Sequence, residues 1–544
     1  MSEKYVGITI GPIFDTIEEA SFPAALWFGS TMFSDITRRL CVELKRQLHV
    51  GKDNLLSPAF DENDTDGLKD GIGKYHDRVI FSIDKENDDL KKSLDDIISK
   101  VMNETVNIFN NDIIEKDNQT GRDQIGCYTT FLQKYLQIKY VITDAGELKG
   151  GKVILAMSKY LDSLEMMRTF PDSNSNNPVA AICRRRNQNQ SQSSSIKDSS
   201  LFKNIETDNN RLVNSQNEIW SIEDIASGKI AAKKTYDENI TDELKSSRKY
   251  KKYYTVVSAD ADGMTGFLQS LTDNQEVTRF SEKCLYYCKE AAKLISEYGG
   301  MPIYAGGDDL LFLAPVQVDG TISGVNDIFG LCGRISQIFN NIMKDNSIGE
   351  VSFEKYAVPT ISFGIAIQYV KYPLYEALNK SRELLGAAKS FGDSEKKKNC
   401  IAVNIEKHSG QSIGTIIGNE AVEVLRKIMN AVDSDNAADD DKSRVIVNFA
   451  HALEEKRALI KVIDDMYLSI RTSWDNMFDN ADQQIMKDYI HEINDIYYGS
   501  LIKNDRIQAM GVESHDRQEK RFNTLLSLLS LSKFFIEKAD ETEV

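Results

Sequence analysis

Residues 303–313, Ile-Tyr-Ala-Gly-Gly-Asp-Asp-Leu-Leu-Phe-Leu, place two glycines and two aspartates between two apolar half-strands. The pattern predicts a tight β-hairpin with carboxylates at its tip. Gly306 and Gly307 permit positive φ angles and let a phosphate approach the backbone. Asp308 and Asp309 offer hard oxygen ligands that suit Mg²⁺ carrying a nucleotide. A surface hairpin with acidic turn residues fits the same pattern, because Gly and Asp are common in turns.

A second acidic segment follows the apolar run 253–259, which is typical of a buried strand. This run ends in Asp260 and Asp262, and a carboxylate at the end of a buried strand is costly unless a cation pairs with it. Helical spacing over 277–298 links the run to the hairpin, so the unit can place Asp260 beside Asp308. Two converging carboxylates form a two-metal site for phosphoryl transfer. A helix N-cap and a loop acid are the alternative for Asp260 and Asp262.

A third element supplies a cation. Residues 360–370 alternate like a strand, and an amphipathic helix is predicted after them. Lys389 falls near the end of this helix, where it could neutralise a triphosphate. The helix dipole also favours a cation at that end, so a purely structural lysine remains the alternative.

Five segments carry a family resemblance: ADADGM at 259–264, the GGDD hairpin, SFGIAI at 362–367, KYPL at 371–374 and LLGAAK at 384–389. In this order they resemble the second palm domain of the large polymerase-like subunit of type III CRISPR effector complexes, most like the Cmr subtype (III-B). That family is related to nucleotide cyclases with GGDEF motifs. VGITIGPIFDTIEEA and ALWFGSTMFSDITRRL, within residues 6–40, resemble the start of the family's first palm domain.

The resemblance implies roles for the matching residues. Asp260 and Asp308 would hold two Mg²⁺ or Mn²⁺ ions with support from Asp309. Gly306 and Gly307 would form the turn against the nucleotide, and Lys389 and Asp262 would belong to the same nucleotide site. A ribose hydroxyl would attack the α-phosphate of ATP, and pyrophosphate would leave. Most of the catalysis would come from positioning and charge neutralisation.

The resemblance also implies an α+β fold with two ferredoxin-like palms and a C-terminal α-helical domain. We expect a first palm over 1–170, a polar insertion over 171–250, a second palm over 251–412 and helices over 413–544. Strands are predicted near 5–14, 70–83 and 139–144, and helices over 21–48 and 86–111. The first palm lacks a GGDD motif, so it is expected to be the non-catalytic half that binds a second ligand. Ser30 and Asp70 are candidates for that second site, although a helix-packing serine and a turn acid are the favoured alternatives.

Two departures from the family's pattern matter. Many members carry a cysteine cluster that binds zinc between the palms, but none of the seven cysteines forms a C-x-x-C pair, so no structural zinc is expected. Many members also begin with a histidine-aspartate nuclease domain. His76-Asp77 and His515-Asp516 lack the other spaced ligands, and we interpret both as chance and expect no DNase activity.

Composition sets the remaining limits. The net charge of −17 argues against a long nucleic-acid groove built by this chain alone. It fits a subunit of a Cmr-type complex that meets guide and target RNA mainly through its partners. Backbone subunits would lie on the palms, and a small helical subunit would dock on the C-terminal helices predicted at 419–432, 445–473, 484–498 and 516–538. No apolar run is long enough for a membrane span, and the scattered cysteines favour a cytoplasmic location.

Several readings of function stay open. The leading one is a target-RNA-activated nucleotidyltransferase that converts ATP into a cyclic oligoadenylate messenger. Some family members join AMP to S-adenosylmethionine instead, which makes that compound a second candidate substrate. A diguanylate-type cyclase fits less well, because the turn reads Gly-Gly-Asp-Asp-Leu without the Glu-Phe ending. A non-catalytic scaffold would not need three clustered aspartates at strand ends.

Overall fold

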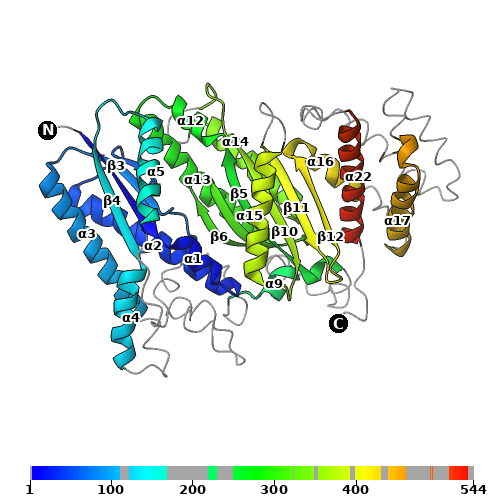
Figure 1. The fold of residues 1–544 in the computed structure, drawn as a ribbon, viewed down its shortest axis with the longest axis horizontal. Coiled ribbons are helices and arrows are strands. Elements are labelled where there is room, and N and C mark those ends of the chain that lie inside the picture. Colours follow the sequence, from blue (N-terminus) through cyan, green and yellow to red (C-terminus); the bar gives the residue numbers. More distant parts are fainter. Residues whose placement is uncertain are drawn as a thin grey trace.

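The computed structural model describes residues 3–110, 122–167, 219–228, 249–322, 324–347, 353–391, 398–430, 439–460, 491, 493 and 514–536. Two β-sheets with covering helices lie next to each other, and further helices follow on the side away from the N-terminus (Figure 1). The fold is α+β, as predicted. Hydrophobic residues from both sheets share two large core clusters, so the two halves are packed together.

The first sheet has the strand order β2-β3-β1-β4, with all pairs antiparallel. Its strands are Leu55–Ser57, Arg78–Ile83, Lys4–Gly11 and Gln137–Asp144. Strand β1 is mostly apolar and buried along nearly its whole length, because both of its faces are covered. Val6, Ile8 and Ile10 share a core cluster with α2 (Pro23–Leu48) and α3 (Asn87–Ile108). Gly7 faces α5 (Gly151–Met166), where an added Cβ would lie 2.8 Å from Met157 Cε.

Two more helices belong to this half. The short helix α1 spans Ile13–Glu18 and contacts α2, and α4 spans Arg122–Tyr135 beside α3. Most residues of α2 are buried, because this helix lies between its own sheet and strand β6 of the second sheet. Helix α2 is therefore packed between the two sheets and contacts both of them.

The second sheet has the order β12-β11-β10-β5-β7-β6. In that order its strands are Ser412–Gly418, Cys400–Glu406, Thr360–Tyr369, Tyr253–Asp262, Asp309–Pro315 and Met301–Gly306. Only the pair β10–β11 is parallel. The central strand β5 is buried along nearly its whole length, which explains its continuous apolar run.

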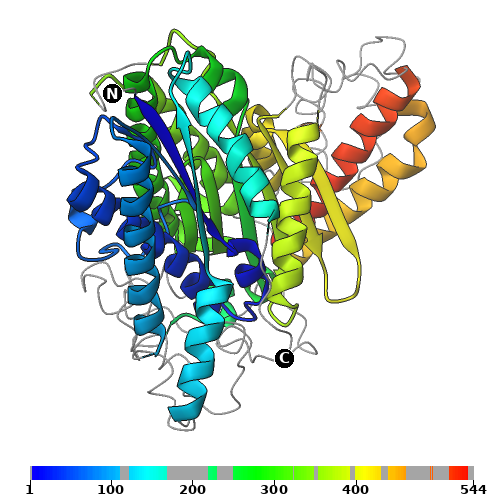
Figure 2. The ribbon, with the colours of Figure 1, turned by 60° about the vertical axis from the view of Figure 1, so that its left-hand side comes forward.

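Helices on both faces fix the ends of these strands (Figure 2). One core cluster joins the sheet to α13 (Asn274–Tyr298) and α14 (Ile328–Lys344). Helix α15 (Leu374–Ser390) packs on β10 and β5. This contact is close at Gly364, where an added Cβ would lie 2.1 Å from the carbonyl oxygen of Ser381. The short helix α12 (Met264–Ser270) follows β5 directly, and α9 (Ile222–Ala226) contacts β5 and β7. A small hairpin of β8 (Gln317–Ile322) and β9 (Val325–Asp327) precedes α14.

Four strands of one sheet correspond to four strands of the other. The order β2-β3-β1-β4 matches β6-β7-β5-β10, with antiparallel pairing at each step in both. The two sheets therefore repeat one topology, as the predicted pair of palms requires, and we call the first sheet with its helices the first palm and the second likewise. They join through a bridge between Gly73 and Tyr304, where the amide of Ala305 donates to the carbonyl of Gly73 at 3.0 Å.

The predicted strands at 139–144 and 360–370 and the helices at 21–48, 86–111 and 277–298 are confirmed. The strand predicted over 5–14 exists but ends at Gly11, because helix α1 begins at Ile13. The strand predicted over 70–83 begins only at Arg78. Of the C-terminal helices, α16 (Val422–Asn430) and α22 (Ser514–Ile536) are confirmed, and α17 (Asp439–Glu455) covers part of 445–473. The polar segment 172–218 and nearly all of 484–498 lie outside the described residues. Strand β12 extends past the boundary predicted at 412, and the domain boundaries stay predictions.

Across the described parts of the chain, we find no helix that combines the length and the apolarity needed to cross a membrane. Cys41, Cys284, Cys288, Cys332 and Cys400 are buried free thiols. These cysteines are core residues of the palms, in agreement with their scattered positions along the sequence.

Candidate functional site

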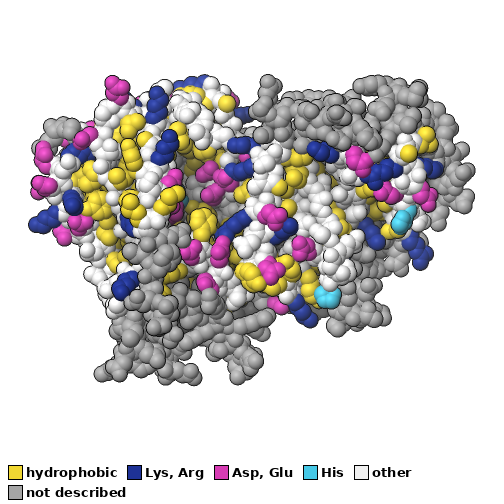
Figure 3. Space-filling model, viewed as in Figure 1, with side chains coloured by type: hydrophobic (Ala, Val, Ile, Leu, Met, Phe, Trp, Pro, Cys, Tyr) yellow, Lys and Arg dark blue, Asp and Glu magenta, His cyan; other side chains and the backbone are white. Residues whose placement is uncertain are grey.

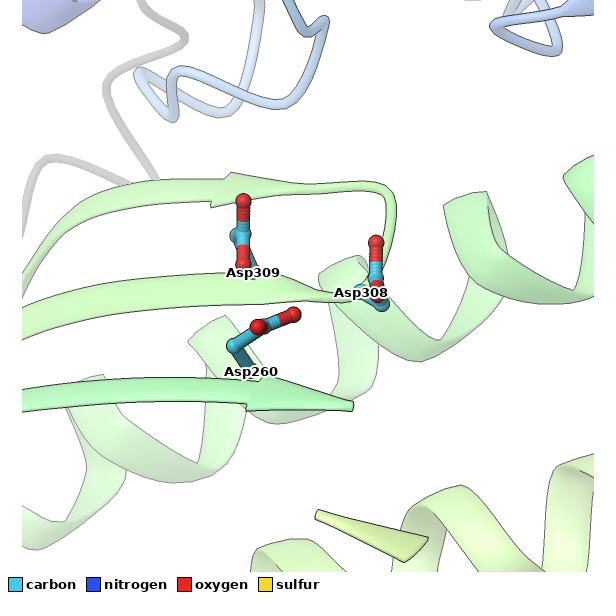
Figure 4. Close-up of side chains that lie close together, drawn as sticks. All are labelled: Asp260, Asp308 and Asp309. Carbon is cyan, nitrogen blue, oxygen red and sulfur yellow. The ribbon is translucent and has the colours of Figure 1, made fainter. Parts of the chain in front are cut away.

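Three carboxylates meet at one end of the second sheet. Asp260 lies near the end of β5, Asp308 lies in the β6–β7 turn and Asp309 is the first residue of β7 (Figure 4). Each offers an oxygen, and these three oxygens lie within 4.8 Å of one another. The antiparallel pairing of β5 with β7 brings Asp260 to the hairpin tip, which the sequence predicts. Clustered hard oxygens at this spacing suit one or two Mg²⁺ or Mn²⁺ ions.

Lys389 lies at this cluster rather than away from it. Its ammonium pairs with Asp260 and donates a second hydrogen bond to the carbonyl of Ala261 at 3.0 Å. Burial and the nearby charge of Lys398 lower the pKa of Lys389 to about 8. We call Asp260, Asp308 and Asp309 the triad. The ammonium of Lys389 balances part of its negative charge, so the triad can attract cations.

The environment opposes ionisation of the two hairpin carboxylates. Burial raises the pKa of Asp308 to about 6. Asp309 lines a cavity. Solvent reaches its carboxylate through the cavity, although protein atoms surround it. This loss of bulk water, together with the charges of Asp308 and Asp77, raises the pKa of Asp309 well above its usual range. A bound dication would reverse this balance, because it favours the ionised carboxylates.

The two glycines of the hairpin serve different purposes. Gly307 has a φ of +70°, the left-handed conformation that the tight turn requires. Of the two glycines that permit a positive φ, only Gly307 adopts one, and Gly306 does not. An added Cβ at Gly306 would lie 2.4 Å from the hydroxyl oxygen of Tyr304. The first glycine therefore makes room for a tyrosine ring of its own strand.

Asp262 differs from its neighbour Asp260. It is buried, and it accepts hydrogen bonds from the hydroxyls of Thr360 and Ser362 and from the backbone amide of Asn399. Burial raises the pKa of Asp262 even though these donors lower it. Its hydrogen bonds connect the end of β5 to β10 and to the start of β11. A direct contact between Asp262 and a nucleotide stays a prediction.

A cavity of 340 Å³ lies between the Gly-Gly-Asp-Asp turn and the first palm. The second palm lines it with Tyr304 and the whole Gly-Gly-Asp-Asp turn. The first palm lines it with Lys74, His76 and Asp77, which precede β3, and with Arg78, the first residue of β3. Apolar side chains from both palms complete the wall, among them Leu56, Ile154, Met264 and Phe280. The arrangement has room for a second substrate beside the triad.

His76 lies against the hairpin, and its own hydrogen bonds are within the first palm. Its Nδ1 accepts the amide of Arg78 at 3.3 Å, so Nε2 carries the proton and faces the hydroxyl of Ser57 at 2.9 Å. Burial and the charge of Arg78 lower the pKa of His76 to about 4, which keeps the ring neutral. An added Cβ at Gly307 would be 3.6 Å from the ring. The dipeptide interpreted as chance therefore lines the cavity, whereas the absence of DNase activity stays a prediction.

The two second-site candidates in the first palm have different surroundings. Asp70 pairs with Lys74 at 2.6 Å, and this buried lysine also pairs with Asp64 at 2.7 Å. Ser30 is buried on α2, and an added Cβ at Gly73 would lie 2.6 Å from its hydroxyl oxygen. This hydroxyl has no hydrogen-bond partner among the described residues. Asp70 and Ser30 do not line the cavity beside the triad, and their roles stay predictions.

Sequence reasoning missed Tyr304, Lys74 and Asp77. The spacing of Tyr304 and Gly306 was a usable signal, since residues two apart on a strand share a face. The others follow a long loop whose path only the packed structure shows.

Two family models match the chain. Residues 253–402 match the model described as "Cas10/Cmr2, second palm domain", and residues 5–109 match "CRISPR-associated protein Cmr2, N-terminal". A curated relative, the CRISPR system Cmr subunit Cmr2 of Pyrococcus furiosus, is 29% identical over 128 residues. That alignment covers 23% of this chain and 12% of the relative, well under two thirds of its length.

Solved structures share the fold at low identity. A chain of the type III-B Cmr-beta complex in the apo state matches with a TM-score of 0.56 and 10% identity, covering 92% of this chain and 82% of that one. The Cmr-beta complex bound to cognate target RNA gives 0.55 and 11%, covering 92% and 83%. The Csm1–Csm4 cassette in complex with cA4 gives 0.50 and 13%, covering 98% and 70%. At these identities the likeness is one of fold.

Proposed function

We propose that this chain, a Cas10 protein of the Cmr type by its two family domains, its curated relative and its fold, is a metal-dependent nucleotidyltransferase. It transfers the AMP part of ATP to a ribose hydroxyl and releases pyrophosphate. The observation that carries this proposal is the convergence of Asp260, Asp308 and Asp309 at the edge of a cavity between two palms.

The residues of the triad would hold Mg²⁺ or Mn²⁺. Bound there, the ions would neutralise phosphate charge and favour ionisation of the attacking hydroxyl. Lys389 would exchange its contact with Asp260 for the phosphates of ATP, because a metal on Asp260 frees the ammonium. The Gly307 turn brings the backbone close to the donor phosphates. The first-palm side of the cavity orients the acceptor, so the protein contributes mainly positioning.

Two acceptors are candidates. If the acceptor is a second ATP, the product is a linear and then a cyclic oligoadenylate. A neighbour of the same fold, the Csm1–Csm4 cassette, was solved in complex with cA4, which supports this reading.

The charges of the cavity favour the other acceptor, S-adenosylmethionine. Two cations line the wall, but Lys74 is paired with Asp64 and Asp70, and Arg78 with Asp162 and Glu165. The carboxylates of Asp77, Asp308 and Asp309 face the same space. A second triphosphate would meet little uncompensated positive charge there, whereas a sulfonium with an amino group suits it.

Product analysis by mass spectrometry separates the readings. The full chain in its complex is supplied with ATP, with ATP and S-adenosylmethionine, or with GTP alone. A product formed only when both substrates are present rejects the oligoadenylate. A cyclic dinucleotide from GTP alone indicates a diguanylate-type cyclase.

The double change Asp308→Asn and Asp309→Asn tests the metal site. It should reduce product formation by about 10³-fold or more, because two ligands of the metals are lost. Asp84→Asn, an exposed acid of the first palm, serves as the control and should leave the rate unchanged. If the double variant still makes the messenger, the proposed site is rejected. If the unmodified chain assembles into the complex but makes no messenger, the chain is a scaffold.

The proposal extends to partners. As a subunit of a type III-B complex, the chain would receive backbone subunits on its palms and a small helical subunit on the region of α17 and α22. On the face shown in Figure 3, basic side chains are interspersed with acidic ones rather than gathered in a stripe. This distribution and the net charge of −17 support contact with guide and target RNA mainly through other subunits.

A further inference from the structure

Tyr304 occupies the centre of the junction between the palms. Its ring packs against the core cluster that contains α2, while it also lines the cavity next to the catalytic turn. The backbone around it is fixed, because Gly73 of the first palm bridges to Tyr304 and accepts the amide of Ala305. A phenol held this firmly has a defined position relative to the triad.

The hydroxyl of Tyr304 is placed toward the reacting end of the hairpin. It lies against Gly306, at a position that any larger residue there would fill. Burial and the charges of Asp309 and Asp77 raise the pKa of Tyr304 well above its usual value, so the phenol keeps its proton. No other described residue forms a hydrogen bond with this hydroxyl, although the hydroxyl can both donate and accept.

We propose that Tyr304 is the positioning residue for the acceptor, and that its hydroxyl binds the ribose hydroxyl that does not attack. This inference rests on the proposed function and deepens it. An acceptor adenosine offers two neighbouring hydroxyls. When one of them lies at the triad, the other falls toward the group beside the triad, which is the phenol of Tyr304. Both candidate acceptors, ATP and S-adenosylmethionine, carry this adenosine ribose.

The first glycine of the GGDD motif gains a specific role from this assignment. Gly306 has neither a positive φ nor free space where its Cβ would be, because Tyr304 fills that space. Gly306→Ala should therefore act through Tyr304, by pushing the ring out of its place. Gly307 acts independently, since it is required by the turn itself.

A binding experiment tests the ribose contact without needing turnover. The full chain in its complex is loaded with Mg²⁺ and the α,β-methylene analogue of ATP to fill the donor site. Binding of adenosine is then compared with binding of 2′-deoxyadenosine and 3′-deoxyadenosine. Wild-type protein should bind one of the two deoxy forms about tenfold more weakly than adenosine, and Tyr304→Phe should lose this discrimination. Tyr286→Phe, an exposed tyrosine on α13, should behave as wild type.

A second arm measures whether the glycine acts through the tyrosine. Gly306→Ala should weaken adenosine binding about as much as Tyr304→Ala, and should change it less than twofold in the Tyr304→Ala background. Equal discrimination in wild type and Tyr304→Phe, or no adenosine binding by wild type, would overturn the inference. So would a full Gly306→Ala effect in the Tyr304→Ala background. If the binding pattern holds but no nucleotide product forms with ATP, the proposed function fails and the ribose contact stands.

Discussion

The two palms differ most at one corresponding connection. In the second palm, β6 and β7 are joined by a tight turn that presents Asp308 and Asp309. In the first palm, the equivalent strands β2 and β3 are joined by the long segment between Ser57 and Arg78. Strand β5 carries Asp260 and Asp262 near its end, whereas the equivalent strand β1 ends in Thr-Ile-Gly, without an acid. The two connections line the same cavity from opposite sides.

The two connections also differ in how their acidic side chains are neutralised, although the two palms share one topology. The tight turn holds acids that no protein cation inside the turn neutralises, so they are available to metals. The long connection also carries acids, Asp61, Asp64 and Asp70, but Lys74 lies near all three and Lys289 of α13 pairs with Asp61. Burial alone would lower the pKa of Lys74, yet the charges of Asp70 and Asp64 outweigh it and raise that pKa. In the first palm, Lys74 and Lys289 therefore neutralise Asp61, Asp64 and Asp70, whereas the turn of the second palm contains no cation of its own.

Removing Lys74, the buried cation of the first palm, should have the largest effect on the difference between the palms. Lys74→Met leaves the buried Asp64 unpaired beside Asp70, and we expect a loss of about 3–5 kcal/mol in the free energy of unfolding. Denaturant unfolding measures it. Lys45→Met, which removes an exposed pair with Glu62, should cost at most about 1 kcal/mol. Equal losses for the two variants would mean that Lys74 does not organise the connection.

The contact between the palms can be weakened without touching either connection. Gly151 on α5 approaches α12 so closely that an added Cβ would lie 1.8 Å from the carbonyl oxygen of Leu268. Gly151→Ala should destabilise the chain by about 2 kcal/mol, because a backbone atom must move. Gly266→Ala on α12, where an added Cβ meets nothing within 4 Å, is the matched control. A stable Gly151→Ala chain would show that the palms can separate there at no cost.

The pH dependence of metal binding sharpens the contrast further. The pKa of Asp308 in the folded chain is about 6, above its usual value, so below that pH a proton must leave before a metal binds. Mn²⁺ affinity should therefore rise with pH by about tenfold per unit up to pH 6 for this proton, and then level off. The stability of the metal-free chain should move the other way, because the unfolded chain ionises this acid at lower pH. Calorimetric titration at several pH values measures the affinity, and a flat profile would contradict the assignment.

The sequence predicts the second palm better than the first for a physical reason. Asp260, Asp308 and Asp309 lie at the ends of strands whose pairing follows from their apolar runs, so their meeting is predictable. The sequence assigns no role to Tyr304, whose side chain lies along its own strand, over Gly306. His76 and Asp77 follow a long loop, whose path depends on contacts such as the buried pairs of Lys74. The proposed exchange of Lys389 between Asp260 and phosphate would depend on bound ligands, which the sequence does not contain.

The location of bound metal tests most directly whether the second palm, and not the first, holds the metal site. Anomalous diffraction from crystals soaked with Mn²⁺ and the α,β-methylene analogue of ATP would show which acids bind the ion. The account predicts manganese between Asp260, Asp308 and Asp309, with Lys389 moved from Asp260 toward the phosphates. Manganese bound at Asp61, Asp64 and Asp70 of the first palm, with the triad empty, would contradict it.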